Sequence, residues 1–187
     1  MNLMTNEDMQ ASSRAATRTT AIDAIAYTIV DADIGKILVA RSRHGVCSIL
    51  IGKADQELEA DLAGRFPASK RLRIDDVAKD DAFRVLNYIQ RPARGLDLEL
   101  DMRGTPFQRS VWQALRRIKA GETTTYAALA SSMTPPSHPR AVASACAANP
   151  IALAIPCHRV VRSDGDLAGY RWGIERKRTL IQRETLA

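Results

Sequence analysis

A cysteine and a histidine are adjacent near the end of the chain, in the run Pro156-Cys157-His158-Arg159-Val160. A thiol attacks as its thiolate, and a neighbouring base or cation helps to form that ion. The pattern predicts a cysteine nucleophile with a lowered thiol pKa. A single Cys-His pair leaves a buried, inert thiol open as the alternative. Cys47 and Cys146 lack such neighbours.

The histidine needs a route to the sulfur and a partner that orients its ring. Neighbouring side chains in an extended segment point to opposite faces, so we expect His158 to act on Cys157 through a water or across a turn. Its second ring nitrogen needs an acceptor. The helix expected over residues 175–185 offers Glu184, for which a solvated surface position is the alternative.

Charge is distributed unevenly along the 187 residues. Residues 1–100 carry 14 basic and 15 acidic side chains, whereas residues 101–187 carry 13 and 6. The basic half indicates a polyanionic partner, with nucleic acid as the first candidate. The alternative is a basic surface that binds no partner.

The sequence contains neither a long apolar run nor a signal peptide, so we expect a cytoplasmic protein without a membrane partner. Three cysteines exclude a disulfide framework and a four-cysteine zinc site.

The basic half begins with a strongly signalled helix. Thr105 is a predicted N-cap, Pro106 suits the first helical position, and Gln108 completes a capping box. Two short helices follow, over residues 126–132 and 139–148, and together they predict a helix-turn-helix. The second is made almost entirely of small residues, which would allow close approach to a DNA minor groove. Tight packing against the core is the equal alternative.

The first half is predicted to be an α/β scaffold. Residues 1–20 are a disordered tail or linker by composition, followed by a scaffold domain over 21–100 and a functional domain over 101–187. Three antiparallel strands form a meander, and two helices follow, the second with Phe83, Leu86 and Ile89 on its apolar face. We expect further strands over 96–100 and 151–155. The predicted strands of the meander are Ile25–Val30, Lys36–Ala40 and Val46–Ile51, and the predicted helices are Asp55–Phe66 and Val77–Ile89.

These residues resemble the O6-alkylguanine-DNA alkyltransferases, also called methylated-DNA–protein-cysteine methyltransferases. The resemblance rests on the Cys157 motif, on the runs at 121–126 and 169–173, on Arg140-Ala141-Val142, and on Asn149 and Glu184. It is closest to the C-terminal half of bacterial Ada proteins and covers about residues 24–186. It implies a small RNase H-like sheet-plus-helix domain followed by a helical, winged helix-turn-helix-like alkyltransferase domain.

The family resemblance implies direct DNA repair, in which an alkyl group moves irreversibly from O6 of guanine, and possibly O4 of thymine, to Cys157. His158 would be the water-mediated base, Glu184 would orient it, and Asn149 would brace the active-site turn. Base flipping is implied as well, because the lesion lies inside a stacked duplex. No cofactor and no metal are implied.

The resemblance also assigns DNA contacts and a substrate pocket. Arg140 would fill the gap left by the flipped base, and Tyr126 would rotate the nucleotide outward. The same implied DNA surface includes Ala141 and Ser144, and the pocket residues are Tyr170, Arg171, Val160, Trp172 and Cys146.

The implied partner is double-stranded DNA with alkylated guanine, bound by a monomer in the bacterial cytoplasm or nucleoid. Two other functions are weighed against this one. A non-catalytic sensor of alkylguanine would lack the acceptor cysteine, which is present here. A thiol hydrolase using Cys157 and His158 would turn over repeatedly instead of stopping after one equivalent.

Overall fold

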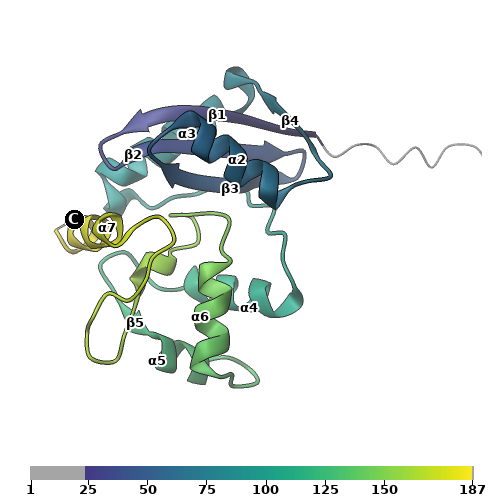
Figure 1. The fold of residues 1–187 in the computed structure, drawn as a ribbon. Coiled ribbons are helices and arrows are strands. Elements are labelled where there is room, and N and C mark those ends of the chain that lie inside the picture. Colours follow the sequence, from purple (N-terminus) through teal and green to yellow (C-terminus); the bar gives the residue numbers. More distant parts are fainter. Residues whose placement is uncertain (1–23, 187) are drawn as a thin grey trace, which may run out of the picture.

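The structure, a computed structural model, describes residues 24–186 and consists of two stacked layers (Figure 1). The predicted tail over residues 1–20 lies outside the described residues. Strands and helices are both present, so the predicted α/β class is confirmed. Across the described range, no helix has the length and apolar character needed to span a membrane.

The upper layer in Figure 1 is a four-stranded sheet in the order β3-β2-β1-β4. The predicted antiparallel meander of β1, β2 and β3 is confirmed. The sequence reading missed β4, which is short, polar and arginine-rich and pairs in parallel with β1. Strand β3 is buried along its whole length, because a helix packs on it, β2 pairs with one of its edges and segments of the second layer meet the other edge. The strands are β1 (Ala24–Ala32), β2 (Gly35–Ser42), β3 (Gly45–Gly52) and β4 (Lys70–Arg73).

Helices α2 (Asp55–Arg65) and α3 (Asp75–Gln90) pack on this sheet. The prediction that Phe83 lies on the buried face of α3 is wrong, since its side chain is 65% exposed. The buried stripe runs at helical spacing through Ala78, Ala82, Val85 and Ile89. Phe83 follows Ala82 directly, so a rotation of about 100° turns it away from the sheet.

The lower layer holds the helices of the basic half. Helix α4 (Pro106–Leu115) begins with the predicted capping box between Thr105 and Gln108. The predicted helix pair is confirmed as α5 (Tyr126–Ser131) and α6 (Pro139–Ala147). The layer is completed by β5 (Thr124–Thr125), η2 (Cys157–Arg159), β6 (Val160–Val161) and α7 (Ile174–Thr185), with η1 (Pro92–Arg94) between the layers in sequence.

The two further predicted strands are wrong. Residues 96–100 make a single bridge, between Leu100 and Val46, and residues 151–155 make one between Ile151 and Ile49. Both segments use the same free edge of β3, so each has room for only a brief parallel contact. Residues 152–154 then form a turn. These two bridges join the layers, and buried side chains from both layers form one continuous core.

The position of Phe83 gives a stability prediction within one helix. Ile89→Ala removes a side chain that is 2% exposed and should lower the free energy of unfolding by about 2–5 kcal/mol. Phe83→Ala, the matched control, should change it by less than about 1 kcal/mol. Urea unfolding followed by circular dichroism measures both. A larger loss for Phe83→Ala would contradict the orientation of α3.

Candidate active site

Cys157 lies in the wall of a cavity of about 550 Å³ in the lower layer. Residues from α6, from the start of α5 and from the loop before α7 surround it. The lining consists of Tyr126, Ala143, Cys146, Ala147, Cys157, Arg162, Ala168, Gly169, Tyr170 and Arg171. A larger hollow of about 730 Å³ beside α4 and α5 has neither cysteine nor histidine in its lining, so the nucleophilic chemistry belongs to the smaller cavity.

Asn149 holds the turn that carries Cys157. Its side-chain oxygen accepts from the Ile151 amide at 2.9 Å, and its side-chain nitrogen donates to the Ile155 carbonyl at 2.8 Å. Leu153 inside this turn has a φ of 69°, a left-handed conformation that side chains disfavour and that the surrounding bonds must maintain. The turn leads into η2, so Cys157 and His158 share a tight helical turn instead of an extended segment.

The Cys157 thiol is shielded from solvent at rest. Burial raises its pKa, while a 3.3 Å hydrogen bond from Asn149 and the positive charge of Lys177 partly oppose that rise. The predicted lowering of this pKa by Arg159 is wrong for the resting site. The Arg159 guanidinium points to Glu184 and not to the sulfur. Cys157 is therefore a thiol at neutral pH, and its proton must be removed during any reaction.

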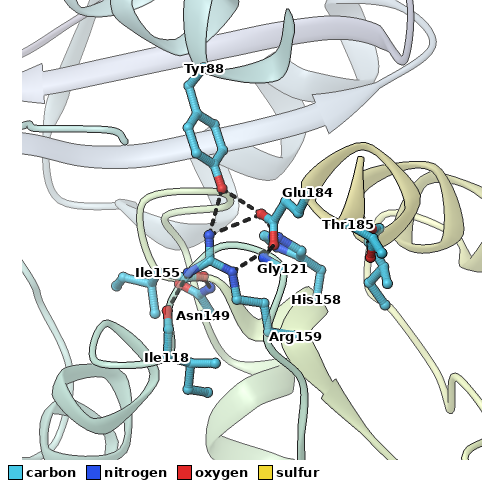
Figure 2. Close-up of polar contacts among 10 residues, drawn as sticks. Tyr88, Ile118, Gly121, Asn149, Ile155, His158, Arg159, Glu184 and Thr185 are labelled. Carbon is cyan, nitrogen blue, oxygen red and sulfur yellow. Dashed lines mark hydrogen bonds and ion pairs between the residues drawn. The ribbon is translucent and has the colours of Figure 1, made fainter. Parts of the chain in front are cut away.

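His158, the residue after Cys157, forms a buried pair with Glu184 (Figure 2). His158 Nε2 lies 2.8 Å from Glu184 Oε1. Because an ionised carboxylate only accepts, Nε2 carries the proton and Nδ1 is the basic nitrogen. Nδ1 is buried and has no hydrogen-bond partner within residues 24–186. Burial lowers the pKa of His158 and the bond to Glu184 opposes this, so the imidazole is neutral at pH 7.

Glu184 accepts hydrogen bonds from four residues on three segments of the chain. Besides His158, it accepts from Arg159 Nε at 2.8 Å, from the Tyr88 hydroxyl at 2.6 Å and from the Gly121 amide at 3.4 Å (Figure 2). Burial alone would raise its pKa. The hydrogen bonds from His158, Arg159 and Tyr88 outweigh burial and hold the pKa well below its usual range, so the carboxylate stays charged.

Helix α6 has two different faces. Val142, Ala145 and Cys146 are buried against the core. The Arg140 and Ser144 side chains lie on the exposed side, with Ala141 half-buried between the two faces. The reading of this small-residue helix as one packed against the core holds for its buried face, and its other face is exposed. Its N-cap is His138, whose Nδ1 accepts from the Arg140 amide at 3.2 Å.

The structure brings most of the expected pocket residues together, but two lie outside the cavity lining. Tyr126, Tyr170, Arg171 and Cys146 line the cavity beside Cys157. Trp172 packs edge-on against Tyr170, with 5.2 Å between ring centroids, and so supports the wall from behind. Val160 is fully buried and its carbonyl accepts from Lys177 at 2.6 Å.

Sequence reasoning missed Tyr88 and Lys177. Lys177 is fully buried, and its side chain lies near both thiols of the cavity, those of Cys146 and Cys157. Its spacing of seven residues from Glu184 places both on one helix face, a signal that the sequence did contain. Tyr88 carried no such signal, because its polar contacts are made with residues on the other layer. No cluster in the described range has the three His, Cys, Asp or Glu side chains of a metal site.

Comparisons with known proteins agree on one family. The model described as "6-O-methylguanine DNA methyltransferase, DNA binding domain" matches residues 106–186. The Escherichia coli bifunctional transcriptional activator/DNA repair enzyme Ada is 47% identical over 86% of this chain and 46% of its own length. The methylated-DNA–protein-cysteine methyltransferase of Mycobacterium tuberculosis is 38% identical, over 86% of this chain and 92% of its own.

The fold agrees as well. A crystal structure of Mycobacterium tuberculosis OGT in complex with DNA superposes with a TM-score of 0.69 and 33% identity, covering 86% of this chain and 93% of that one. The chain spans about half the length of the Ada proteins it matches.

The charge of Lys177 gives a prediction about the thiol. In the DNA-free protein, the pH midpoint for iodoacetamide labelling of Cys157 should lie above the ordinary thiol value of about 8.5. Lys177→Met removes a cation that lowers this pKa, so the midpoint should rise further. Peptide mass spectrometry across a pH series measures it. Lys79→Met on the exposed side of α3 is the control, and an unchanged midpoint in Lys177→Met would refute the effect.

Proposed function

Because the chain belongs to the methylated-DNA–protein-cysteine methyltransferase family, we propose that it repairs DNA by taking a methyl or other alkyl group from O6 of guanine onto its own Cys157. The single observation that carries this proposal is the position of Cys157 in a cavity wall, followed in the same helical turn by His158, which pairs with Glu184. The proposal extends to O4-alkylthymine as a further substrate of the same site.

The chemistry begins with removal of the thiol proton. His158 Nδ1 is a buried, unpaired base, and no hydrogen bond within the described residues joins it to Cys157, so the proton passes through a bridging water. Glu184 stabilises the imidazolium that results. The thiolate attacks the alkyl carbon, the new S–C bond forms as the C–O6 bond breaks, and guanine keeps the electron pair. The thioether is a poor leaving group, which limits each molecule to one turnover.

Duplex DNA containing alkylated guanine is the proposed partner. The matching family model is a DNA-binding domain, and the related OGT was crystallised with DNA. On α6, Arg140 would fill the space of the flipped base, while Ala141 and Ser144 approach the groove. Tyr126, at the start of α5 and in the cavity lining, would rotate the nucleotide toward Cys157.

We assign a different role to each of the two layers. Residues 24–100 act as the scaffold domain and residues 101–187 as the DNA-binding and acceptor domain. A monomer suffices, because a single chain contributes the acceptor, its base and the DNA-facing helix. One relative is named a DNA repair enzyme and another a methylated-DNA–protein-cysteine methyltransferase, which supports action at the bacterial nucleoid in the cytoplasm.

Transfer to Cys157 is tested with an oligonucleotide that carries O6-methylguanine. Wild-type protein should remove the methyl group in a burst of one equivalent, and mass spectrometry should place a gain of one methyl group on the peptide with Cys157. Cys157→Ala should transfer nothing, whereas Cys47→Ala, a buried cysteine in β3, should keep the full burst. Continued turnover would indicate a hydrolase, and binding without transfer would indicate a sensor.

The role of Arg140 is tested by comparing two substrates. Free O6-methylguanine base needs no extrusion, whereas a duplex lesion must be flipped at a cost of a few kcal/mol. Arg140→Ala should therefore slow transfer from duplex DNA about tenfold more than transfer from the free base. Arg84→Ala, an arginine of α3 on the other layer, is the matched control. Equal losses on both substrates would mean that Arg140 supports the pocket instead.

A further inference from the structure

Tyr88 is the only residue of the upper layer that forms a side-chain hydrogen bond with the His158–Glu184–Arg159 cluster within residues 24–186 (Figure 2). It lies on the buried side of α3 and its side chain points down from that helix into the lower layer. Its ring is 3% exposed. The hydroxyl is therefore placed by the packing of the whole upper layer, not by the segment that carries the nucleophile.

The Tyr88 hydroxyl forms two hydrogen bonds, one as donor and one as acceptor. It donates to Glu184 Oε1 at 2.6 Å and accepts from Arg159 Nη2 at 2.8 Å. Arg159 is held in turn by the Ile118 carbonyl and by Glu184 Oε2. The same Arg159 Nη2 also donates to Glu184 Oε1, at 3.0 Å, so the phenol and the guanidinium together hold Oε1 in place.

Oε1 is also the oxygen that accepts from His158 Nε2, at 2.8 Å. Tyr88, Arg159 and His158 thus all donate to one carboxylate oxygen and share its negative charge. A donor on Oε1 weakens the pull of that oxygen on the imidazole proton, which makes the imidazole less basic than it would be against a carboxylate free of other donors. The position of the imidazole ring depends on the same oxygen.

We propose that Tyr88 is a positioning residue for the alkyl transfer, which fixes Glu184 Oε1 and tunes the basicity of His158 through the oxygen that the two side chains share. This inference rests on the proposed function and extends the reacting assembly to the upper layer. It gives α3 a role in the chemistry beyond packing on the sheet.

The other groups around His158 set the background against which Tyr88 acts. Glu184 and Lys177 approach it from α7, and Cys157 and Arg159 are its neighbours in η2. The Tyr170 ring meets it edge-on, with 6.5 Å between centroids, and adds no charge at neutral pH because burial raises the pKa of its hydroxyl. Removal of the Tyr88 hydroxyl alone deletes none of these side chains; it removes only the hydrogen bonds of that hydroxyl with Glu184 and Arg159.

Tyr88→Phe is the test, because it removes the hydroxyl and keeps the ring. Single-turnover transfer from free O6-methylguanine base is measured between pH 5 and 8, since the free base avoids any effect on DNA binding. The active form holds neutral His158, so the rate falls as pH falls through the pKa of His158. Without the hydroxyl, Oε1 acts more strongly on the imidazole, and this acid limb should move to higher pH. The rate on the plateau should fall by about tenfold from lost positioning.

Tyr27→Phe is the matched control. Tyr27 in β1 donates to Glu59 Oε1 at 2.9 Å, a tyrosine–glutamate bond of the same kind in the same layer and distant from the cavity. This variant should keep the wild-type rate and the wild-type acid limb. Thermal unfolding of both variants separates stability from chemistry.

The possible outcomes are distinct. A wild-type acid limb in a folded Tyr88→Phe protein would overturn the proposal, whatever its melting temperature, because a structural role moves stability and not the pH midpoint. If Tyr88→Phe fails to fold, Tyr88→Leu is the second variant, because it also lacks the hydroxyl donor, and a wild-type acid limb there would also overturn the proposal. Absence of transfer by the wild-type protein would overturn the proposed function itself.

Discussion

A buried carboxylate is the constraint on which the rest of this structure depends. Glu184 is 6% exposed and ionised, and a charge so placed is costly unless donors surround it. The chain provides them from α3, η2 and the loop at Gly121, which are distant in sequence and converge on α7. The hydrogen bonds to this carboxylate therefore hold the two layers together, in addition to their shared apolar core. A shift of either layer would leave a charge without its partners.

Elements with local signals could be predicted from the sequence. The capping box at Thr105 and Gln108, the meander of the first three strands and the pair of short helices α5 and α6 each depend on residues close together in the chain. Cys157, His158 and Glu184 could be proposed as a group because residue type and family resemblance pointed to them. The geometry of the pair formed by His158 and Glu184 then agrees with that reading.

Features determined by distant parts of the chain could not be predicted. The apolar segment at 151–155 reads as a strand, but the side chain of Asn149 satisfies its backbone and bends it into a turn. Arg159 stands beside Cys157 in sequence, yet it serves Glu184, because a buried carboxylate attracts a guanidinium more strongly than a neutral thiol does. Tyr88 reads as an ordinary core aromatic until the second layer is packed beneath it.

The position of Asn149 before a proline affects how long its side-chain amide survives in the folded protein. Asparagine side chains age by deamidation, in which the amide nitrogen of the next residue attacks the side-chain carbonyl and closes a succinimide ring. The next residue here is Pro150, whose nitrogen carries no hydrogen and cannot act in this way. The Pro150 carbonyl is also fixed, by Ile49 and Ser48 of β3. The amide that touches the reactive sulfur is thus protected from this form of ageing.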